Sequence, residues 1–223
     1  VYIRFKKPLF KLMHRLDYFM IVSKQPQIYL ISPSEIILDK FFEKFKKIVQ
    51  KVEISCLRLS LSSSLEKDII ETASNVKSLI DPLGIPILIE DHYRLVPQLG
   101  LNGVHLSNGS KSVKHVRKHL GAKYIIGAYC GNSKHNALIA AENGADYISM
   151  GPLVTQNLGN EEVVPTETFS WWSEFVEIPI VAEGALNKHI IKDLWDKTDF
   201  ITITNEIWNA ADIERSLEDL IPS

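Results

Sequence analysis

The chain has 223 residues, of which 45% are hydrophobic and 23% are charged. This composition is that of an ordinary globular protein and excludes disordered, collagen-like and low-complexity classes. Lys and Arg number 25 and Asp and Glu number 27, which gives a net charge of −2. A chain this close to neutral has no overall attraction for nucleic acid or anionic lipid, so we expect neither nucleic acid nor a membrane as a partner.

The two cysteines and the N-terminus bear on where the protein works. Cys56 and Cys130 lie in apolar, strand-like runs without the spacing of a zinc site, so we expect buried, reduced thiols. Reduced thiols favour the cytosol, and no apolar run approaches the ~20 residues of a membrane span. The sequence therefore predicts a cytoplasmic protein. Residues 1–26 are interpreted as a basic N-terminal extension, with an organelle-targeting segment or a surface contact as alternatives to a simple helix.

From Gln27 onward, short β-branched runs alternate with longer segments of helical period. The predicted strands are Gln27–Ser32, Ile54–Leu59, Ile85–Ile89, Gly103–Leu106, Tyr124–Ala128, Asp146–Met150, Pro179–Ala182 and Phe200–Thr204. The predicted helices are one capped by Ser34 and extending to Ile48, then Ser64–Ile80, Tyr93–Leu99, Ser112–Leu120, Lys134–Asn143, Thr168–Phe175, Lys188–Trp195 and Ala210–Leu220.

Eight strand–helix units predict the α/β class and a single (β/α)8 TIM barrel over residues 27–223, because open doubly wound sheets more often have five or six strands. The strands are apolar on both faces, as in a parallel sheet covered by helices. Gly84, Gly100, Gly121 and Gly144 precede the third to sixth strands, where the C-caps of helices belong.

The active site of such a barrel lies at the carboxyl ends of the strands, which turns the order of elements into candidate residues. Arg58 lies in an apolar strand, CLRLSL, where a guanidinium needs an anion. We consider it the catalytic residue, bound to a ligand phosphate or pyrophosphate. A structural ion pair with Glu90 or Asp91 is the alternative.

Carboxylates and a histidine end the third and fourth strands. Asp91 is the candidate metal ligand, with a helix N-cap as the alternative, and Glu90 is a candidate substrate contact. His105 is either a substrate contact with acid–base capacity or a histidine that is merely buried and hydrogen-bonded.

The last three strands supply the remaining candidates. Gly184, Thr204 and Asn205 occupy the usual phosphate site of these barrels, where backbone N–H groups receive the anion. Gly151 opens the longest irregular stretch, 151–165, and is a further candidate substrate contact. We expect Trp171–Trp172 to pack the outer helix against the barrel, with a dimer contact or a lid as alternatives.

Three segments carry a resemblance to a known family: LIEDHYRLVPQLGLNGVHL, IIGAYCGNSKHNALIAAENGADYISMGPL and IPIVAEGAL. With their spacing, the sequence from Gln27 to its end resembles the thiamine phosphate synthase/TenI family. The resemblance implies a (β/α)8 barrel that joins hydroxymethylpyrimidine pyrophosphate to thiazole phosphate, with Mg²⁺ holding the pyrophosphate. It implies small phosphorylated heterocycles as partners, and self-association of the chain stays open. The TenI branch instead aromatises a thiazole phosphate tautomer with histidines.

The match fails at several positions that handle pyrophosphate in the family. Where synthases carry Gln-Leu-Arg-x-Lys, this chain keeps Arg58 but has Ser60 in place of the Lys. Asp91 is kept after Glu90, which replaces an Asn, and Ser110 replaces a second acidic metal ligand. Two further features of the family have no counterpart in this chain: the loop Pro-Thr-x-Thr-Lys after the sixth strand and the catalytic histidine of the tautomerases.

Two functions follow as hypotheses. The first is a thiamine phosphate synthase whose pyrophosphate site is eroded, since cationic clamps and metal ions supply most of the catalysis in such reactions. The second is a catalytically weak or inactive barrel that binds a thiamine precursor or another small phosphate, in a regulatory or TenI-like role.

Overall fold

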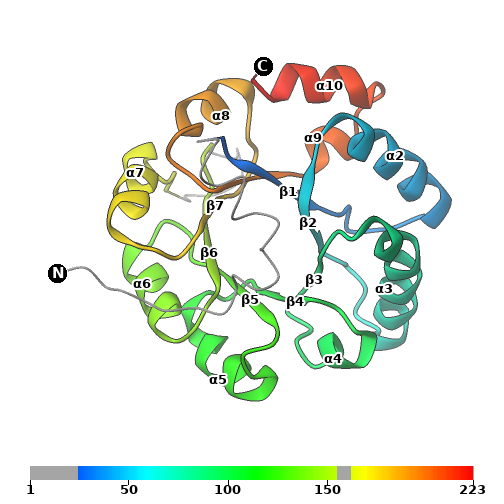
Figure 1. Cartoon of the computed structure of the whole chain (residues 1–223), viewed down its shortest axis with the longest axis horizontal. Coiled ribbons are helices and arrows are strands. Elements are labelled where there is room, and N and C mark those ends of the chain that lie inside the picture. The colour runs from blue at the N-terminus through cyan, green and yellow to red at the C-terminus, as the bar shows by residue number, and fades with distance from the viewer. Residues whose placement is uncertain (1–24, 155–161, 223) are drawn as a thin grey trace.

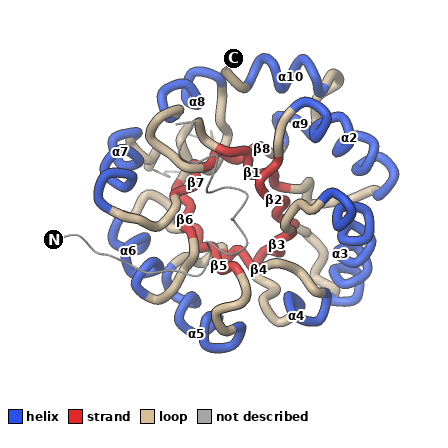
Figure 2. Tube along the Cα trace, in the orientation of Figure 1, coloured by secondary structure: helices blue, strands red, loops and turns tan. Residues whose placement is uncertain are grey.

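Eight parallel strands form a closed ring at the centre of the computed structural model, and helices surround the ring (Figures 1 and 2). The structure describes residues 25–154 and 162–222. The strands are β1 (Gln27–Ile31), β2 (Ile54–Leu59), β3 (Ile87–Glu90), β4 (Gly103–Leu106), β5 (Ile125–Tyr129), β6 (Tyr147–Met150), β7 (Ile180–Ala182) and β8 (Phe200–Ile203). Each strand pairs with the next, and β1 pairs with β8 to close the barrel. The predicted (β/α)8 fold is confirmed.

Helices follow the strands and cover the outer wall of the barrel. They are α2 (Leu38–Lys51), α3 (Glu66–Ile80), α4 (Leu95–Leu99), α5 (Ser110–Leu120), α6 (Lys134–Glu142), α7 (Thr166–Phe175), α8 (Lys188–Leu194), α9 (Asn205–Trp208) and α10 (Ile213–Leu220), with a short 3₁₀ helix at Asp81–Leu83. In α2 the apolar side chains of Phe41, Phe45 and Ile48 recur at helical spacing and are buried against the barrel.

Some helix ends differ from the prediction. Ser34 does not cap α2, which begins at Leu38 after Ile37, because Ser34 lies in the preceding loop and its carbonyl accepts a bond from Ser62. The predicted closing helix Ala210–Leu220 corresponds to α10, and the structure adds α9 directly after β8, a helix that the pattern did not predict. The Asp212 side chain accepts the N–H of Arg215 and so begins α10 at Ile213.

The four glycines expected at C-caps adopt the left-handed backbone that such positions need. The φ angles are 69° at Gly84, 64° at Gly100, 71° at Gly121 and 99° at Gly144. Only glycine takes these angles without a steric cost. Gly84, Gly100 and Gly121 are C-caps as predicted, whereas Gly144 follows Asn143, the C-cap of α6.

Side chains of each strand alternate between two cores. Those facing outward, such as Leu57 and Leu59, pack beneath the helices. Those facing inward form a separate cluster in the barrel lumen, made by Tyr29, Ile31, Cys56, Leu88, Tyr147 and Val181. Both cysteines are buried and free, as expected. This alternation places Arg58, two residues after Cys56, on the lumen side of β2.

The tryptophan pair on α7 packs as predicted. Trp172 is fully buried and donates its indole N–H to the carbonyl of Ile178 at 2.7 Å. Trp171 is partly buried and lies beneath the ammonium of Lys134, 4.9 Å from the ring centre. Packing therefore accounts for the pair.

Parts of two predictions lie outside the described residues. Residues 1–24 hold most of the N-terminal extension, and residues 155–161 fall in the irregular stretch after β6. Among the described residues, no helix combines the length and apolar character needed to cross a membrane.

Candidate active site

Arg58 projects from β2 into the lumen, near the end of the barrel where the strands finish. Only 5% of the residue is exposed. Its guanidinium holds the Glu183 carboxylate with two bonds, Nη1 to Oε2 at 3.1 Å and Nη2 to Oε1 at 2.5 Å. Glu183 directly follows β7, so the pair spans the barrel mouth. Such a planar, two-pronged arrangement is the strongest geometry available to a guanidinium and a carboxylate.

Glu90, the last residue of β3, makes the other charged contact of Arg58. Its Oε2 lies 3.3 Å from Nε of Arg58, which has no aligned hydrogen-bond acceptor within the described structure. The Glu90 side chain is 28% exposed and that of Glu183 is 16% exposed, while that of Arg58 is 6% exposed. The two carboxylates thus lie nearer to solvent than the cation they surround. The expected pairing of Arg58 with Glu90 is confirmed.

Asp91 faces away from this pair. Its Oδ1 accepts the backbone N–H of Ser107 at 2.9 Å, and its Oδ2 accepts the Ser107 hydroxyl. The residue is exposed and has a φ of 56°, which a non-glycine residue adopts at a cost. Among the described residues it neither pairs with Arg58 nor caps α4, whose N-cap is Arg94. Those two alternatives are therefore wrong, and its carboxylate joins the ends of β3 and β4.

His105 is buried in the lumen and ends a chain of hydrogen bonds. Its Nδ1 lies 2.8 Å from the Tyr147 hydroxyl, which lies 2.7 Å from the Tyr29 hydroxyl. On the other side, Nε2 lies 3.9 Å from Oε2 of Glu183. Burial, with the nearby Arg58 charge, lowers the pKa of His105 to about 3, against the opposing effect of Glu183. His105 is therefore neutral at physiological pH, and the carboxylate favours the proton on Nε2.

The ion pair keeps both of its members charged. Burial alone would raise the pKa of Glu183, but the charge and hydrogen bonds of the Arg58 guanidinium hold it at about 2. Burial would likewise lower the pKa of Arg58, and the Glu183 carboxylate keeps it well above its ordinary value. Glu183 is thus a fixed anion and not a proton acceptor near neutral pH.

Gly151 directly follows β6 and lies against the backbone of Glu183, which directly follows β7. A Cβ at this position would lie 1.9 Å from the carbonyl oxygen of Glu183, so only glycine fits. The Tyr129 hydroxyl donates to the Gly151 carbonyl at 2.8 Å, and the following peptide bond to Pro152 is cis. Gly184, with a φ of 104°, passes close to Pro152. These contacts bring Gly151 and Gly184 together beside Glu183.

Thr204 and Asn205 follow β8, next to the end of β7. Asn205 is the first residue of the short helix α9. The backbone N–H of Thr204 donates to Oε2 of Glu206 at 3.0 Å. One of the amides expected to receive a phosphate is thus bonded to a side chain of the same chain.

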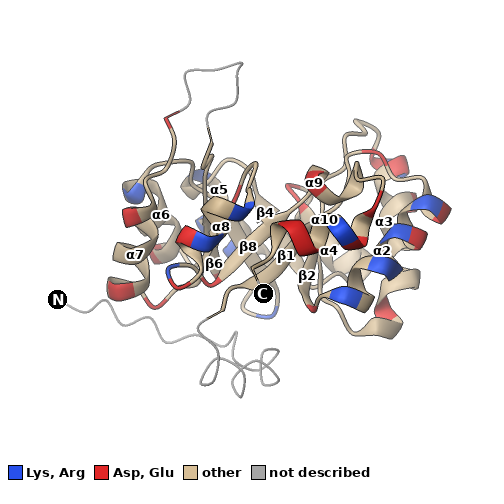
Figure 3. Cartoon of the chain, turned by 90° about the horizontal axis from the view of Figure 1, so that it is seen from above, with Lys and Arg blue, Asp and Glu red and all other residues tan. Residues whose placement is uncertain are grey.

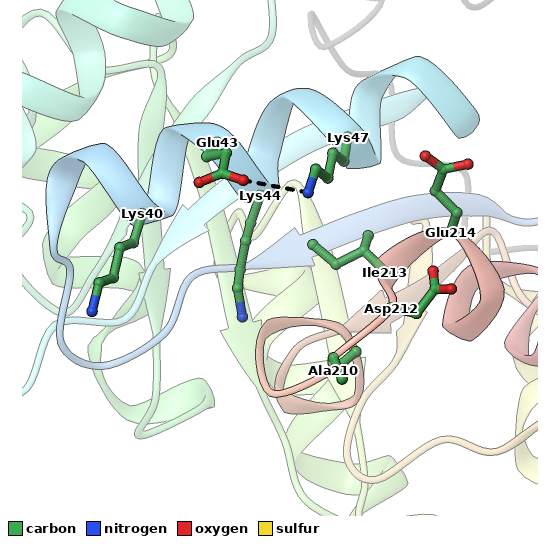
Figure 4. A pocket seen from close by; sticks show the side chains of 9 residues that line it. Lys40, Glu43, Lys44, Lys47, Ala210, Asp212, Ile213 and Glu214 are labelled. Carbon is green, nitrogen blue, oxygen red and sulfur yellow. Dashed lines mark hydrogen bonds and ion pairs between the residues drawn. The ribbon is translucent and has the colours of Figure 1, made fainter.

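A separate hollow lies on the outer surface, between α2 and the start of α10 (Figure 4). It encloses about 560 Å³ and is lined by lysines and carboxylates, among them Lys40, Lys44 and Asp212. One of its lysines is paired, since Glu43 contacts Lys47, and Lys44 donates to the carbonyl of Trp208. The hollow is lined by none of the predicted site residues.

The structure therefore brings Arg58, Glu90 and His105 into one cluster, and it adds residues that the predicted site omitted. These are Glu183, Tyr147 and Tyr29. Glu183 was recognisable as a charged residue at a strand end. The two tyrosines gave no such signal, because an aromatic residue within an apolar strand is ordinarily core.

A closed (β/α)8 barrel whose charged residues gather at the carboxyl ends of its strands is the architecture of an enzyme-type barrel with its site at the mouth. Figure 3 shows the barrel from the side, with α9, which directly follows the carboxyl end of β8, among its labelled elements. Comparison with known proteins identifies the family within this class of barrels. The family model described as thiamine monophosphate synthase matches residues 28–207, and the chain belongs to that family.

Individual relatives agree with the family match. A thiamine-phosphate synthase of Rhodospirillum centenum is 26% identical over 187 residues, covering 82% of this chain and 89% of its own length. The thiamine-phosphate synthase of Shouchella clausii is 30% identical over 171 residues, covering 75% of this chain and 81% of its own. Among solved structures, a thiamine phosphate pyrophosphorylase from Pyrococcus furiosus superposes with a TM-score of 0.73 at 20% identity, covering 87% and 93% of the two chains.

Proposed function

We propose that this protein is a thiamine phosphate synthase of reduced catalytic power. It would join hydroxymethylpyrimidine pyrophosphate to thiazole phosphate and release pyrophosphate. The observation that carries the proposal is the family match over residues 28–207, which spans every strand that contributes to the Arg58 cluster. Two relatives named thiamine-phosphate synthase match over most of their length, which supports the same reaction class.

Mg²⁺ fits the residues at the end of β3 in part. Glu90 and Asp91 supply carboxylate oxygens, the donor type that Mg²⁺ prefers, and both reach solvent. Among the described residues, no group of three or more acidic, histidine or cysteine side chains surrounds a single point. Mg²⁺ is commonly held by one or two carboxylates together with substrate phosphates, and Asp91 would hold it in that way. When bound, the ion would neutralise charge on the pyrophosphate.

The residues of the chain would divide the remaining work. Arg58, already held at the mouth by Glu183, would place positive charge under the leaving pyrophosphate. The backbone amides after β7 and β8, near Gly184 and Asn205, would receive the phosphate of the thiazole. His105, neutral and with Nε2 directed to Glu183, would act as a fixed hydrogen-bond donor and not as a general acid.

A second function is favoured by one observation. Both Nη atoms of Arg58 are bonded to Glu183, and Ser60 follows on the same strand in place of a lysine. Such a mouth lacks the cationic clamp that expulsion of pyrophosphate needs. The alternative is a barrel that binds a thiamine precursor or another small phosphate with little or no turnover.

Formation of thiamine phosphate from both substrates, with and without Mg²⁺, separates the two functions. The synthase proposal expects turnover that depends on Mg²⁺ and falls at least tenfold in Arg58→Gln. Isothermal calorimetry with thiazole phosphate would detect binding under either function. Absence of turnover together with clear binding of thiazole phosphate would establish the alternative and overturn the synthase proposal.

A further inference from the structure

Several donors that suit an anion at this barrel mouth are already bonded to carboxylates of the chain. The carboxylate of Glu183 accepts hydrogen bonds from the two Nη atoms of Arg58, and that of Glu206 accepts one from the backbone N–H of Thr204. Asp91 similarly takes the N–H of Ser107. A phosphate group that enters the mouth meets these donors only by competing with a carboxylate of the protein.

The charges around Arg58 make this competition unequal. Glu183 and Glu90 together carry two negative charges within 3.3 Å of one guanidinium. Both carboxylates are more exposed than the guanidinium, so an incoming anion reaches negative charge first. Like charges at such distances repel strongly in a partly buried site.

Glu183 is the member of this set that the structure holds most firmly. Its backbone N–H donates to Met150 at 3.0 Å, and its carbonyl lies against Gly151. Its carboxylate faces Arg58 with two bonds and His105 at 3.9 Å. These contacts hold the side chain against Arg58, so a ligand must displace it to reach the guanidinium.

We propose that Glu183 is a specificity-determining residue. Because its carboxylate occupies the guanidinium of Arg58, it weakens the binding of free phosphate groups at the barrel mouth and makes their binding depend on a divalent cation. Glu206 acts in the same sense at the Thr204 amide. This inference rests on the proposed function for the location of the site, but it concerns ligand charge and not turnover.

Inorganic pyrophosphate is the probe, and calorimetry in buffer that contains EDTA and then in buffer that contains Mg²⁺ is the measurement. The unmodified protein is expected to bind pyrophosphate weakly but measurably in EDTA and at least tenfold more tightly with Mg²⁺. In EDTA, Glu183→Gln should raise the affinity at least tenfold, about 1.4 kcal/mol, because it removes a charge and frees Arg58. Glu206→Gln should raise it at least threefold.

Two variants isolate the cause. Glu53→Gln makes the same charge change just before β2, at the opposite end of the barrel from Arg58, and should leave the affinity within twofold. The double variant Arg58→Gln with Glu183→Gln should lose the gain of the single variant. If the gain persists without Arg58, Glu183 acts only through general charge, and the proposal is wrong.

The remaining outcomes also decide the matter. A folded Glu183→Gln with unchanged or weaker affinity in EDTA overturns the proposal, and so does tight binding of pyrophosphate by the unmodified protein in EDTA. If Glu183→Gln does not fold, the smaller change Glu206→Gln decides by its gain or lack of gain. None of these readings requires thiamine phosphate formation, so a protein without synthase turnover can still confirm the inference, and an active synthase can still refute it.

Discussion

Arg58 on β2 and Glu183 after β7, 125 residues apart in sequence, form a two-pronged ion pair across the mouth of the barrel. The pair joins opposite parts of the strand ring, and Glu90 adds a second carboxylate to it. This group of one cation and two carboxylates determines the charge of the candidate site.

Removal of the guanidinium should destabilise the fold. Arg58→Met leaves the Glu183 carboxylate buried without its partner, and breaking a buried pair in this way costs about 3–5 kcal/mol. Equilibrium unfolding in urea measures the loss. The control is Lys51→Met, because Lys51 pairs with Glu214 at the exposed surface, where solvent screens an ion pair and its loss changes stability little. Equal losses in the two variants would contradict the assignment of a buried ion pair.

Stability should fall on mild acidification because of His105. Its pKa in the folded state is about 3, below the ordinary value near 6.5, so the unfolded chain binds a proton more readily. The stabilisation is complete above about pH 6.5 and declines as the pH falls toward 3, by about 2 kcal/mol at pH 5. Urea midpoints at pH 7, 6 and 5 measure the slope. His105→Gln should flatten it, whereas His189→Gln, at an exposed site on α8, should not.

At lower pH, protonation of Glu183 should further reduce the stability of the fold. Its pKa is about 2 in the folded state, below the usual range of a glutamate, so its contribution is present above about pH 4.5 and declines toward pH 2. Glu183→Gln should remove this part of the pH dependence and leave the part due to His105. A slope below pH 4.5 that is unchanged in Glu183→Gln would show that other carboxylates cause it.

The approach of β6 to β7 should not tolerate a methyl group at Gly151. Its Cβ would lie 1.9 Å from the Glu183 carbonyl oxygen, so Gly151→Ala must separate the two strand ends, at a cost of about 1–3 kcal/mol. The matched control is Gly84→Ala, which has a left-handed φ of 69° but no atom within 4 Å of the added Cβ. Its cost should be about 1–2 kcal/mol, all from backbone strain. Because Gly151→Ala shifts Glu183 while Gly84→Ala does not, only Gly151→Ala should also change ligand binding at the mouth.

Restoring charge to the site should raise synthase activity. The triple variant Ser60→Lys, Glu90→Asn and Ser110→Asp adds a cation and an acidic metal ligand and removes a repulsive carboxylate. The rate of thiamine phosphate formation should rise at least tenfold, about 1.4 kcal/mol of barrier. The unmodified protein should remain well below a typical turnover of ~1–10 s⁻¹. Turnover already in that range would show that other residues provide the clamp.

Much of this molecule was predictable from local sequence. Short β-branched runs located every strand, helical periodicity located a helix after each strand except for α9, and the count of eight units predicted the barrel, because both signals arise from burial of apolar side chains. Helix ends were less predictable. Whether Ser34 or Asp212 caps a helix depends on the direction in which the chain leaves the barrel, and only packing decides that direction.

For the site, the position of Arg58 inside an apolar strand already required an anionic partner, since an isolated guanidinium is too costly to bury. Which anion it meets follows from the three-dimensional arrangement of the strands. Closure of the barrel brings the end of β7 across from β2, so that Glu183 and not Asp91 completes the pair. It also turns Asp91 toward Ser107 and stacks Tyr147 under His105. Contacts between distant strands depend on the register and stagger of the closed ring, which no local pattern in the chain encodes.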